Sequence, residues 1–178
     1  MSTLSHNECV AVEYALRKNC IPIKEKEDFC LQNVIENSFA IEFPLHLLAP
    51  SKSYNIFEYE EPFIDFLLKR YKNVDTAFKI VTDAKKRNLS LNSGFLRIDM
   101  LICKNRKFTA IEWNDYSTHY SSNGFFDLTH RNYSDFIKSL ILSDNKNIAF
   151  KEVMLCGDTK TKERKIKRIL SKILKDSA

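Results

Sequence analysis

The chain has 178 residues, of which 29% are charged and 44% hydrophobic, and these are ordinary values for one globular domain. It contains only three widely separated glycines, whereas a dinucleotide fingerprint or a Walker-type phosphate loop needs two or three within about eight residues, so both motifs are excluded. The net charge of +5 lies wholly in residues 158–178, which carry eight cations and three anions, so the remainder of the chain is neutral.

Cysteine usage and the N-terminal residues bear on the cellular compartment. The five cysteines form an odd set without a Cys-x-x-Cys pair, which argues against a zinc ribbon or a disulfide framework. The start MSTLSHNE lacks the pattern of a signal peptide, and no apolar run approaches the roughly 18 residues that span a membrane. We therefore expect a reducing, cytoplasmic environment and no membrane association.

The first 56 residues predict a helical and then irregular extension. Ser5 and Glu8 form a capping box, which predicts a helix that ends at Asn19. Three prolines interrupt short apolar stretches between residues 21 and 56, so no regular element is predicted there.

A second helix of about ten residues is predicted from Pro62, since proline is favoured in the first turn and Phe63 and Leu67 begin an apolar stripe. Ala77–Val81 is a short apolar run that predicts a strand, and residues 82–93 predict a loop or a hairpin arm.

The second half of the chain alternates predicted strands and helices. Two strands are expected to form a hairpin, and a helix, a strand and a basic amphipathic helix follow. This order predicts an α/β fold in a single domain, residues 1–178, with a central mixed sheet of about four to five strands (an antiparallel meander plus a further strand) flanked by helices. The predicted ranges are 95–102 and 107–114 for the hairpin, 127–142 for the helix, 148–155 for the strand and 159–175 for the last helix.

Two acids stand in otherwise apolar strands. Alternation along the strands places Asp99 on the face of Leu101, and Glu112 on the face of Ala110. A buried carboxylate needs a cation, a metal ion or several donors, and two acids on adjacent antiparallel strands come within reach of one hard cation such as Mg²⁺. The alternative is structural, with Asp99 paired to a neighbouring basic side chain such as Arg97.

The stretch Arg97-Ile98-Asp99-Met100-Leu101-Ile102, a short turn, and Ala110-Ile111-Glu112-Trp113-Asn114 resemble the PD-(D/E)XK nuclease superfamily, which has the restriction-endonuclease-like fold. The resemblance extends to the element order over residues 57–157, the nuclease-like core, which leaves 1–56 as an N-terminal extension and 158–178 as a basic C-terminal helix. It implies a metal-dependent endonuclease that hydrolyses DNA or RNA, with Mg²⁺ or Mn²⁺ held by Asp99 and Glu112. A glutamate of the first core helix often joins the metal site in this family, and Glu61 is the candidate here, with Glu58 and Glu60 as competitors.

The family has a catalytic lysine two residues after the second acid, where this chain has Asn114. One interpretation is a resemblance to very-short-patch-repair-like members with the pattern E-x-D-G-x-x-H, in which His119, one position late, is a candidate general base or phosphate donor. The other is that the cation comes from the following helix, where Arg131 or Lys138 could reach back. Asn114 and His119 are thus candidate catalytic residues beside the two acids.

Contact with nucleic acid is expected from cations near the acid pair. The candidates are Arg131 and three residues of the terminal helix, Lys162, Lys165 and Arg168, provided that this helix lies beside the acids. Otherwise its cations are the solvated face of a docked helix. Two further functions stay open: a catalytically inactive nucleic-acid-binding or regulatory module on the same fold, and a protein-interaction domain whose acids are structural. Members of this family often form homodimers, although no segment of this sequence indicates an interface.

Overall fold

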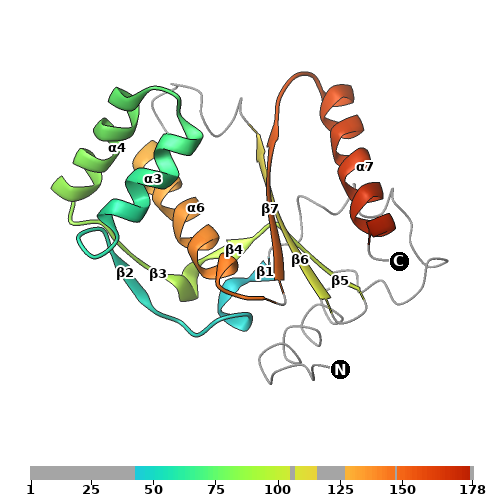
Figure 1. Ribbon diagram of the computed structural model, residues 1–178, viewed down its shortest axis with the longest axis horizontal. Coiled ribbons are helices and arrows are strands. Elements are labelled where there is room, and N and C mark those ends of the chain that lie inside the picture. The colour runs from blue at the N-terminus through green and yellow to red at the C-terminus, as the bar shows by residue number, and fades with distance from the viewer. Residues whose placement is uncertain (1–42, 105–106, 116–126, 147, 177–178) are drawn as a thin grey trace.

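The computed structural model describes residues 43–104, 107–115, 127–146 and 148–176, and over these residues the fold is α/β, as predicted. Figure 1 shows three layers, in which a sheet separates helices α3, α4 and α6 from helix α7. The helices are α3 (Glu60–Arg70), α4 (Val74–Lys86), α6 (Leu128–Ser143) and α7 (Thr159–Asp176). The strands are β1 (Phe43–Pro44), β2 (Ser53–Asn55), β3 (Ser90–Asn92), β4 (Arg97–Ile98), β5 (Met100–Lys104), β6 (Lys107–Asp115) and β7 (Ile148–Leu155), and two 3-10 turns are η1 (Leu45–Leu47) and η2 (Ser93–Phe95).

The central sheet is mixed, as predicted, but it has three strands in the order β5-β6-β7 and not four to five. Strands β5 and β6 pair antiparallel, which confirms the predicted hairpin, and β6 and β7 pair parallel through the crossover helix α6. Two separate two-stranded sheets pair β1 with β4 and β2 with β3. The expected single sheet is divided because the strand predicted over residues 95–102 breaks at Asp99, between β4 and β5.

Helix α4 corrects the strand that was predicted at Ala77–Val81. The buried residues of this segment, Ala77, Ile80, Val81 and Ala84, follow a helical period, and five residues of apolar sequence could not distinguish the two elements. The side chain of Asn73 caps the helix by accepting a hydrogen bond from the backbone nitrogen of Asp75 at 2.9 Å. Residues 82–93, for which a loop or a hairpin arm was predicted, form the end of α4 and strand β3, and β3 pairs antiparallel with β2.

The remaining helices and strands of the second half lie where they were predicted. Helix α3 begins two residues before Pro62, and α6, β7 and α7 match their predicted ranges to within one residue at each end. The helix predicted over residues 5–19 lies outside the described residues. Over the described part of the chain, none of the helices combines the length and the apolar character needed to cross a membrane.

Two apolar clusters form the core, one on each face of the sheet. The larger packs α3, α4 and α6 against the sheet, and its aromatic centre includes Phe63 and Tyr133, whose ring centroids lie 5.1 Å apart. The smaller packs α7 against the other face, with Trp113 of β6 and Leu170 of α7 both buried. Helix α7 and helix α6 therefore lie on opposite faces of the sheet (Figure 1).

Candidate functional site

The break at Asp99 sets the geometry of the two acids. Strands β5 and β6 are in register from Lys104↔Lys107 to Met100↔Ile111, so the next step of the register places Asp99 opposite Glu112. Directly opposed residues of an antiparallel pair project to the same face, and the pair two positions further along the ladder, Leu101 and Ala110, belongs to the core cluster under α6. Asp99 and Glu112 both line one pocket on this side of the sheet.

Strict alternation along residues 95–102 does not continue through the break. Strict alternation would place Leu96 and Ile98 on the same face as Met100 and Ile102. Leu96 and Ile98 instead pack in the cluster under α3, α4 and α6, whereas Met100 and Ile102 pack under α7. Asp99 is the residue at which the backbone changes face, so it leaves the regular ladder.

Because Asp99 lies outside the regular β ladder, its backbone and side chain form hydrogen bonds with Glu112 and Trp113 of β6. Its backbone nitrogen donates to Oε1 of Glu112 at 3.1 Å, and its Oδ2 accepts from the backbone nitrogen of Trp113 at 2.8 Å. The charge of Asp99 also raises the pKa of Glu112. The two carboxyl groups are therefore immediate neighbours at one point of the sheet.

Helix α6 supplies a cation to this pair. The ammonium of Lys138, which is only 8% exposed, lies 3.2 Å from Oε2 of Glu112. Glu112 is itself 2% exposed, and desolvation raises its pKa to about 7 even though the charge and the hydrogen bond of Lys138 act in the opposite direction. Glu112 therefore changes its protonation state near neutral pH.

Asn114, two residues after Glu112, is fully buried and forms hydrogen bonds through both its amide nitrogen and its amide oxygen. Its Nδ2 donates to Oε1 of Glu152 on β7 at 2.8 Å, and its Oδ1 accepts from Nη2 of Arg131 at 3.1 Å. Arg70, at the end of α3, forms ion pairs with Glu152 and with Asp135 of α6, the latter at 2.9 Å. Asn114 thus links β6 to a buried charge network between β7, α3 and α6.

A pocket of about 250 Å³ opens over the acid pair, between the η2–β4 segment and α6. The two carboxylates, Asp99 and Glu112, share it with three cations and one histidine. Its described lining residues are Phe95, Leu96, Arg97, Asp99, Glu112, His130, Arg131, Ser134 and Lys138.

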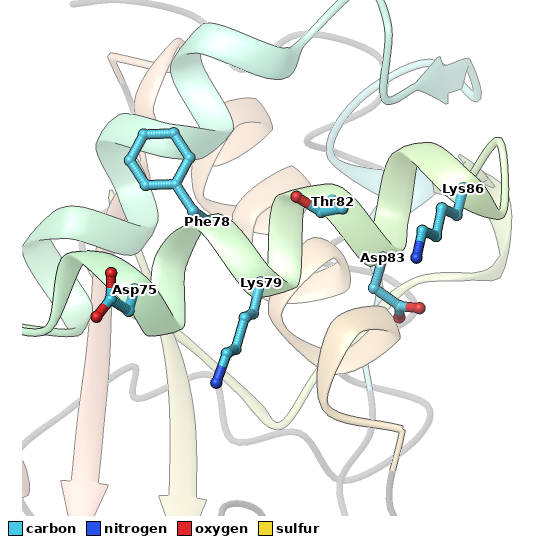
Figure 2. A pocket seen from close by; sticks show the side chains of 6 residues that line it. All are labelled: Asp75, Phe78, Lys79, Thr82, Asp83 and Lys86. Carbon is cyan, nitrogen blue, oxygen red and sulfur yellow. The ribbon is translucent and has the colours of Figure 1, made fainter.

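A larger hollow of about 490 Å³ lies on the outer face of α4, and Figure 2 shows the side chains that line it. Its described residues all come from that helix and carry alternating charges, with Asp75 and Asp83 beside Lys79 and Lys86. They offer no carboxylate pair on adjacent strands. The pocket over Asp99 and Glu112 is therefore the candidate site.

Glu61, the third predicted metal ligand, is not brought to the pocket. It is exposed at the beginning of α3, whereas the end of that helix, at Arg70, reaches the charge network. Nine residues of helix separate them by about 14 Å. Its competitor Glu60 forms an ion pair with Lys85, 2.9 Å away. His119 lies outside the described residues.

The predicted nucleic-acid contacts divide between the two faces. Arg131 lines the pocket, but Lys162, Lys165 and Arg168 lie on α7, across the sheet from α6. The ammonium of Lys165 donates to the backbone carbonyl of Met154. The cations of α7 were expected to contact nucleic acid only if this helix lies beside the two acids. Helix α7 lies on the other face of the sheet, so this condition is not met.

Several residues of the site were not assigned from the sequence. His130 showed no spacing to another ligand, and Asp135 and Glu152 meet Arg70 only through tertiary contacts across more than 60 residues. One signal was available for Asp135, because a charged residue at this position interrupts the apolar face of α6, which also includes Phe136 and Ile137.

Comparison with known proteins gives no family for the chain: no family model, curated protein or solved structure matches it. Function is therefore inferred from the chemistry of the pocket.

Proposed function

We propose that the chain is a metal-dependent nuclease of the restriction-endonuclease-like fold, which hydrolyses phosphodiester bonds of DNA or RNA. The observation that supports this most directly is the triad of Asp99, Glu112 and Lys138, in which two carboxyl groups and a buried ammonium line one pocket. Such a set resembles the acids and the lysine of that superfamily, with the lysine supplied by α6 and not by the position of Asn114.

The donor set fits Mg²⁺ or Mn²⁺ as the cofactor. Over the described residues, no group of three or more His, Cys, Asp and Glu side chains is placed to hold a metal ion. Mg²⁺, however, is typically held by one or two carboxylates together with waters and substrate phosphate oxygens, so Asp99 and Glu112 suffice. When bound, such an ion stabilises the negative charge of the phosphate and of the leaving oxygen.

The basic residues of the pocket supply the other functions that hydrolysis requires. Lys138 favours the ionised form of Glu112, which is the form that binds a cation. Arg97 and Arg131 line the pocket on either side and carry the charge that attracts a phosphate. His130 is an exposed lining residue, and an imidazole there is suited to donate to a phosphate oxygen.

The test is cleavage by the purified full-length chain. Single- and double-stranded DNA and RNA are incubated with Mg²⁺, with Mn²⁺ or with EDTA, for the wild type, Asp99→Ala and Lys138→Met. We expect metal-dependent cleavage that Asp99→Ala abolishes and Lys138→Met slows by about a hundredfold or more. Lys86→Met, on the outer face of α4, is the matched control and keeps the wild-type rate. Cleavage that survives Asp99→Ala would overturn the proposal.

One observation favours the second candidate, a nucleic-acid-binding module without catalysis. Three carboxylate oxygens of the pair have protein partners, since Oδ2 of Asp99 accepts from Trp113 and both oxygens of Glu112 accept hydrogen bonds. This arrangement satisfies the acids through the protein's own donors. Binding of nucleic acid at low salt without cleavage in either metal would support this module.

A further inference from the structure

We propose that Phe95 is a stacking platform for an unpaired nucleobase, so that the substrate is a single strand or a strand with a displaced base. The inference rests on the proposed function and names the substrate class of the same pocket. It begins from the exposure of this phenylalanine, whose side chain is 87% exposed and lines the pocket beside Arg97 and Asp99. Among the exposed large hydrophobic side chains in the described part of the chain, Phe95 is the one that lines this pocket.

The backbone under Phe95 is fixed by the residues around it. Ser93 is buried and exchanges two hydrogen bonds with Lys52, one from its backbone nitrogen and one to its hydroxyl oxygen, both of 2.8 Å. Leu96 is buried, and its carbonyl accepts from the backbone nitrogen of Leu45 at 3.0 Å. The exposed ring therefore stands between two anchored neighbours.

Gly94 allows this turn to lie close to the preceding loop. A Cβ at this position would lie 2.4 Å from the hydroxyl of Ser51 and 2.9 Å from Oδ1 of Asn92, which accepts a hydrogen bond from the backbone nitrogen of Gly94. Because the turn is held on both sides, little backbone entropy is lost when a ligand stacks on Phe95.

The pocket beside the ring is suited to a phosphate and not to a base. Its volume of about 250 Å³ is below the range of about 300–1,000 Å³ that encloses larger ligands, and its side chains are mostly charged. Arg97, Arg131 and Lys138 outnumber the two carboxylates, which favours an anion. With the phosphate in the pocket, the attached base lies at the rim, where Phe95 offers an apolar π-face.

A paired base within a duplex does not expose its face, because it is already stacked on both sides. A phenylalanine at the rim therefore favours a base that has left the stack, and stacking on an aromatic side chain tolerates any base. The expected preference is for unpaired nucleotides of any sequence, in either DNA or RNA.

The test is a binding measurement made without catalysis, in EDTA and low salt. Fluorescence anisotropy gives the Kd for labelled oligonucleotides of about 12 nucleotides, a length within the range of single-strand sites. The oligonucleotides are single-stranded DNA, single-stranded RNA, the DNA duplex and an abasic strand with the same phosphate spacing. The proteins are the wild type, Phe95→Ala, Phe95→Trp and the control Phe78→Ala, an exposed phenylalanine on α4.

We expect tighter binding of the single strands than of the duplex, and a loss of about tenfold in single-strand affinity for Phe95→Ala. Phe95→Trp and Phe78→Ala keep the wild-type affinity, and Phe95→Ala leaves the abasic strand unaffected. The inference is overturned if the duplex binds more tightly, if Phe95→Ala binds single strands as the wild type does, or if it loses the abasic strand equally.

The same measurement separates this inference from the proposed function. Base-dependent binding through Phe95 together with an absence of cleavage in Mg²⁺ and Mn²⁺ would refute the nuclease alone. Cleavage that is unchanged in Phe95→Ala, with unchanged affinity, would refute the stacking platform alone. A wild-type protein that binds no strand at low salt would refute both.

Discussion

Glu112 is a carboxyl group whose surroundings oppose its ionised form. It is almost wholly buried, and its pKa is raised from 4.5 to about 7 chiefly by desolvation. Lys138 counters this desolvation, while the charges of Asp99 and Asp135 add to it. A carboxyl group in a pocket with a pKa raised to about 7 is typical of functional sites. Its burial in the ionised form lowers the free energy of unfolding.

The first prediction is a pH-dependent stability that originates at Glu112. Below about pH 4.5 the group is protonated in both the folded and the unfolded state. Between about pH 4.5 and 7 the folded protein keeps a proton that the unfolded chain releases, so the contribution to the free energy of unfolding falls as pH rises and levels off above about 7. The fall is at most about 3 kcal/mol.

Urea denaturation in EDTA at several pH values, for the wild type and Glu112→Gln, measures this contribution. Glutamine cannot titrate, so we expect the variant to gain stability relative to the wild type as pH rises from about 4.5 to 7. Glu163→Gln, at an exposed position of α7, controls for the change in net charge. A difference between Glu112→Gln and the wild type that is constant across this range would contradict the prediction.

At the scale of elements, helix α6 positions Arg131 and Lys138, two of the three cations of the pocket. The side chain of Asp127 caps the N-terminus of this helix. The side chain of Asp127 accepts from the backbone nitrogen of His130 at 3.0 Å, and its two oxygens each lie 2.6 Å from the guanidinium of Arg87. One side chain therefore caps α6 and ties it to the end of α4.

The second prediction separates these two roles. Asp127→Ala removes the cap and the ion pair, and we expect it to lower the free energy of unfolding by about 1–2 kcal/mol. Asp127→Asn keeps an acceptor for His130 and loses the ion pair, which is about half exposed, so the expected loss is below about 1 kcal/mol. Chemical denaturation of both variants measures the difference. An equal loss in both would show that the contact with Arg87, and not the cap, holds the helix.

Elements whose pattern is local could be predicted from the sequence, and pairings across the chain could not. The apolar period of α6 and α7 and the short segment 148–155 before Gly157 gave the positions of these helices and of β7 to within one residue. Helix α4 was missed because Ala77–Val81, read alone, fits a strand, and its cap at Asn73 lies outside that run. The pairing of β1 with β4 joins residues more than 50 positions apart and leaves no local trace.

In the candidate site, too, features that depend on local sequence could be predicted, and contacts between distant residues could not. The sequence could predict that Asp99 and Glu112 come close together, because strand alternation and a hairpin are local features. The contact of Lys138 with Glu112 joins a helix to a strand across 26 positions, so the sequence could offer it only as one of two alternatives. The break at Asp99 was not predicted, because alternation assumes an uninterrupted strand.

At the scale of the whole molecule, the candidate pocket lies on the α6 side of the sheet, and helix α7 packs on the other side.

The third prediction concerns the packing of α7 on the sheet. Leu170 of α7 is fully buried against Trp113 and its neighbours, so Leu170→Ala should lower the free energy of unfolding by about 2–5 kcal/mol. Exposed Lys167→Ala on the same helix should change it by less than about 0.5 kcal/mol. Similar losses in both variants, measured by denaturation, would contradict this docking of α7.

The fourth prediction concerns which cations of the molecule contact the phosphates of a bound nucleic acid. The net charge of +5 belongs to the segment that forms α7, on the face opposite the acid pair, whereas Arg131 lines the pocket itself. Each phosphate contact with a single strand contributes about 0.7 to the slope of log Kd against log salt concentration. Arg131→Gln should therefore reduce that slope by about 0.7, and the double variant Lys162→Ala, Arg168→Ala should leave it unchanged. Titrations between low and moderate salt in EDTA measure both slopes. A reduced slope in the α7 variant would instead mean that the strand crosses the edge of the sheet and contacts both faces.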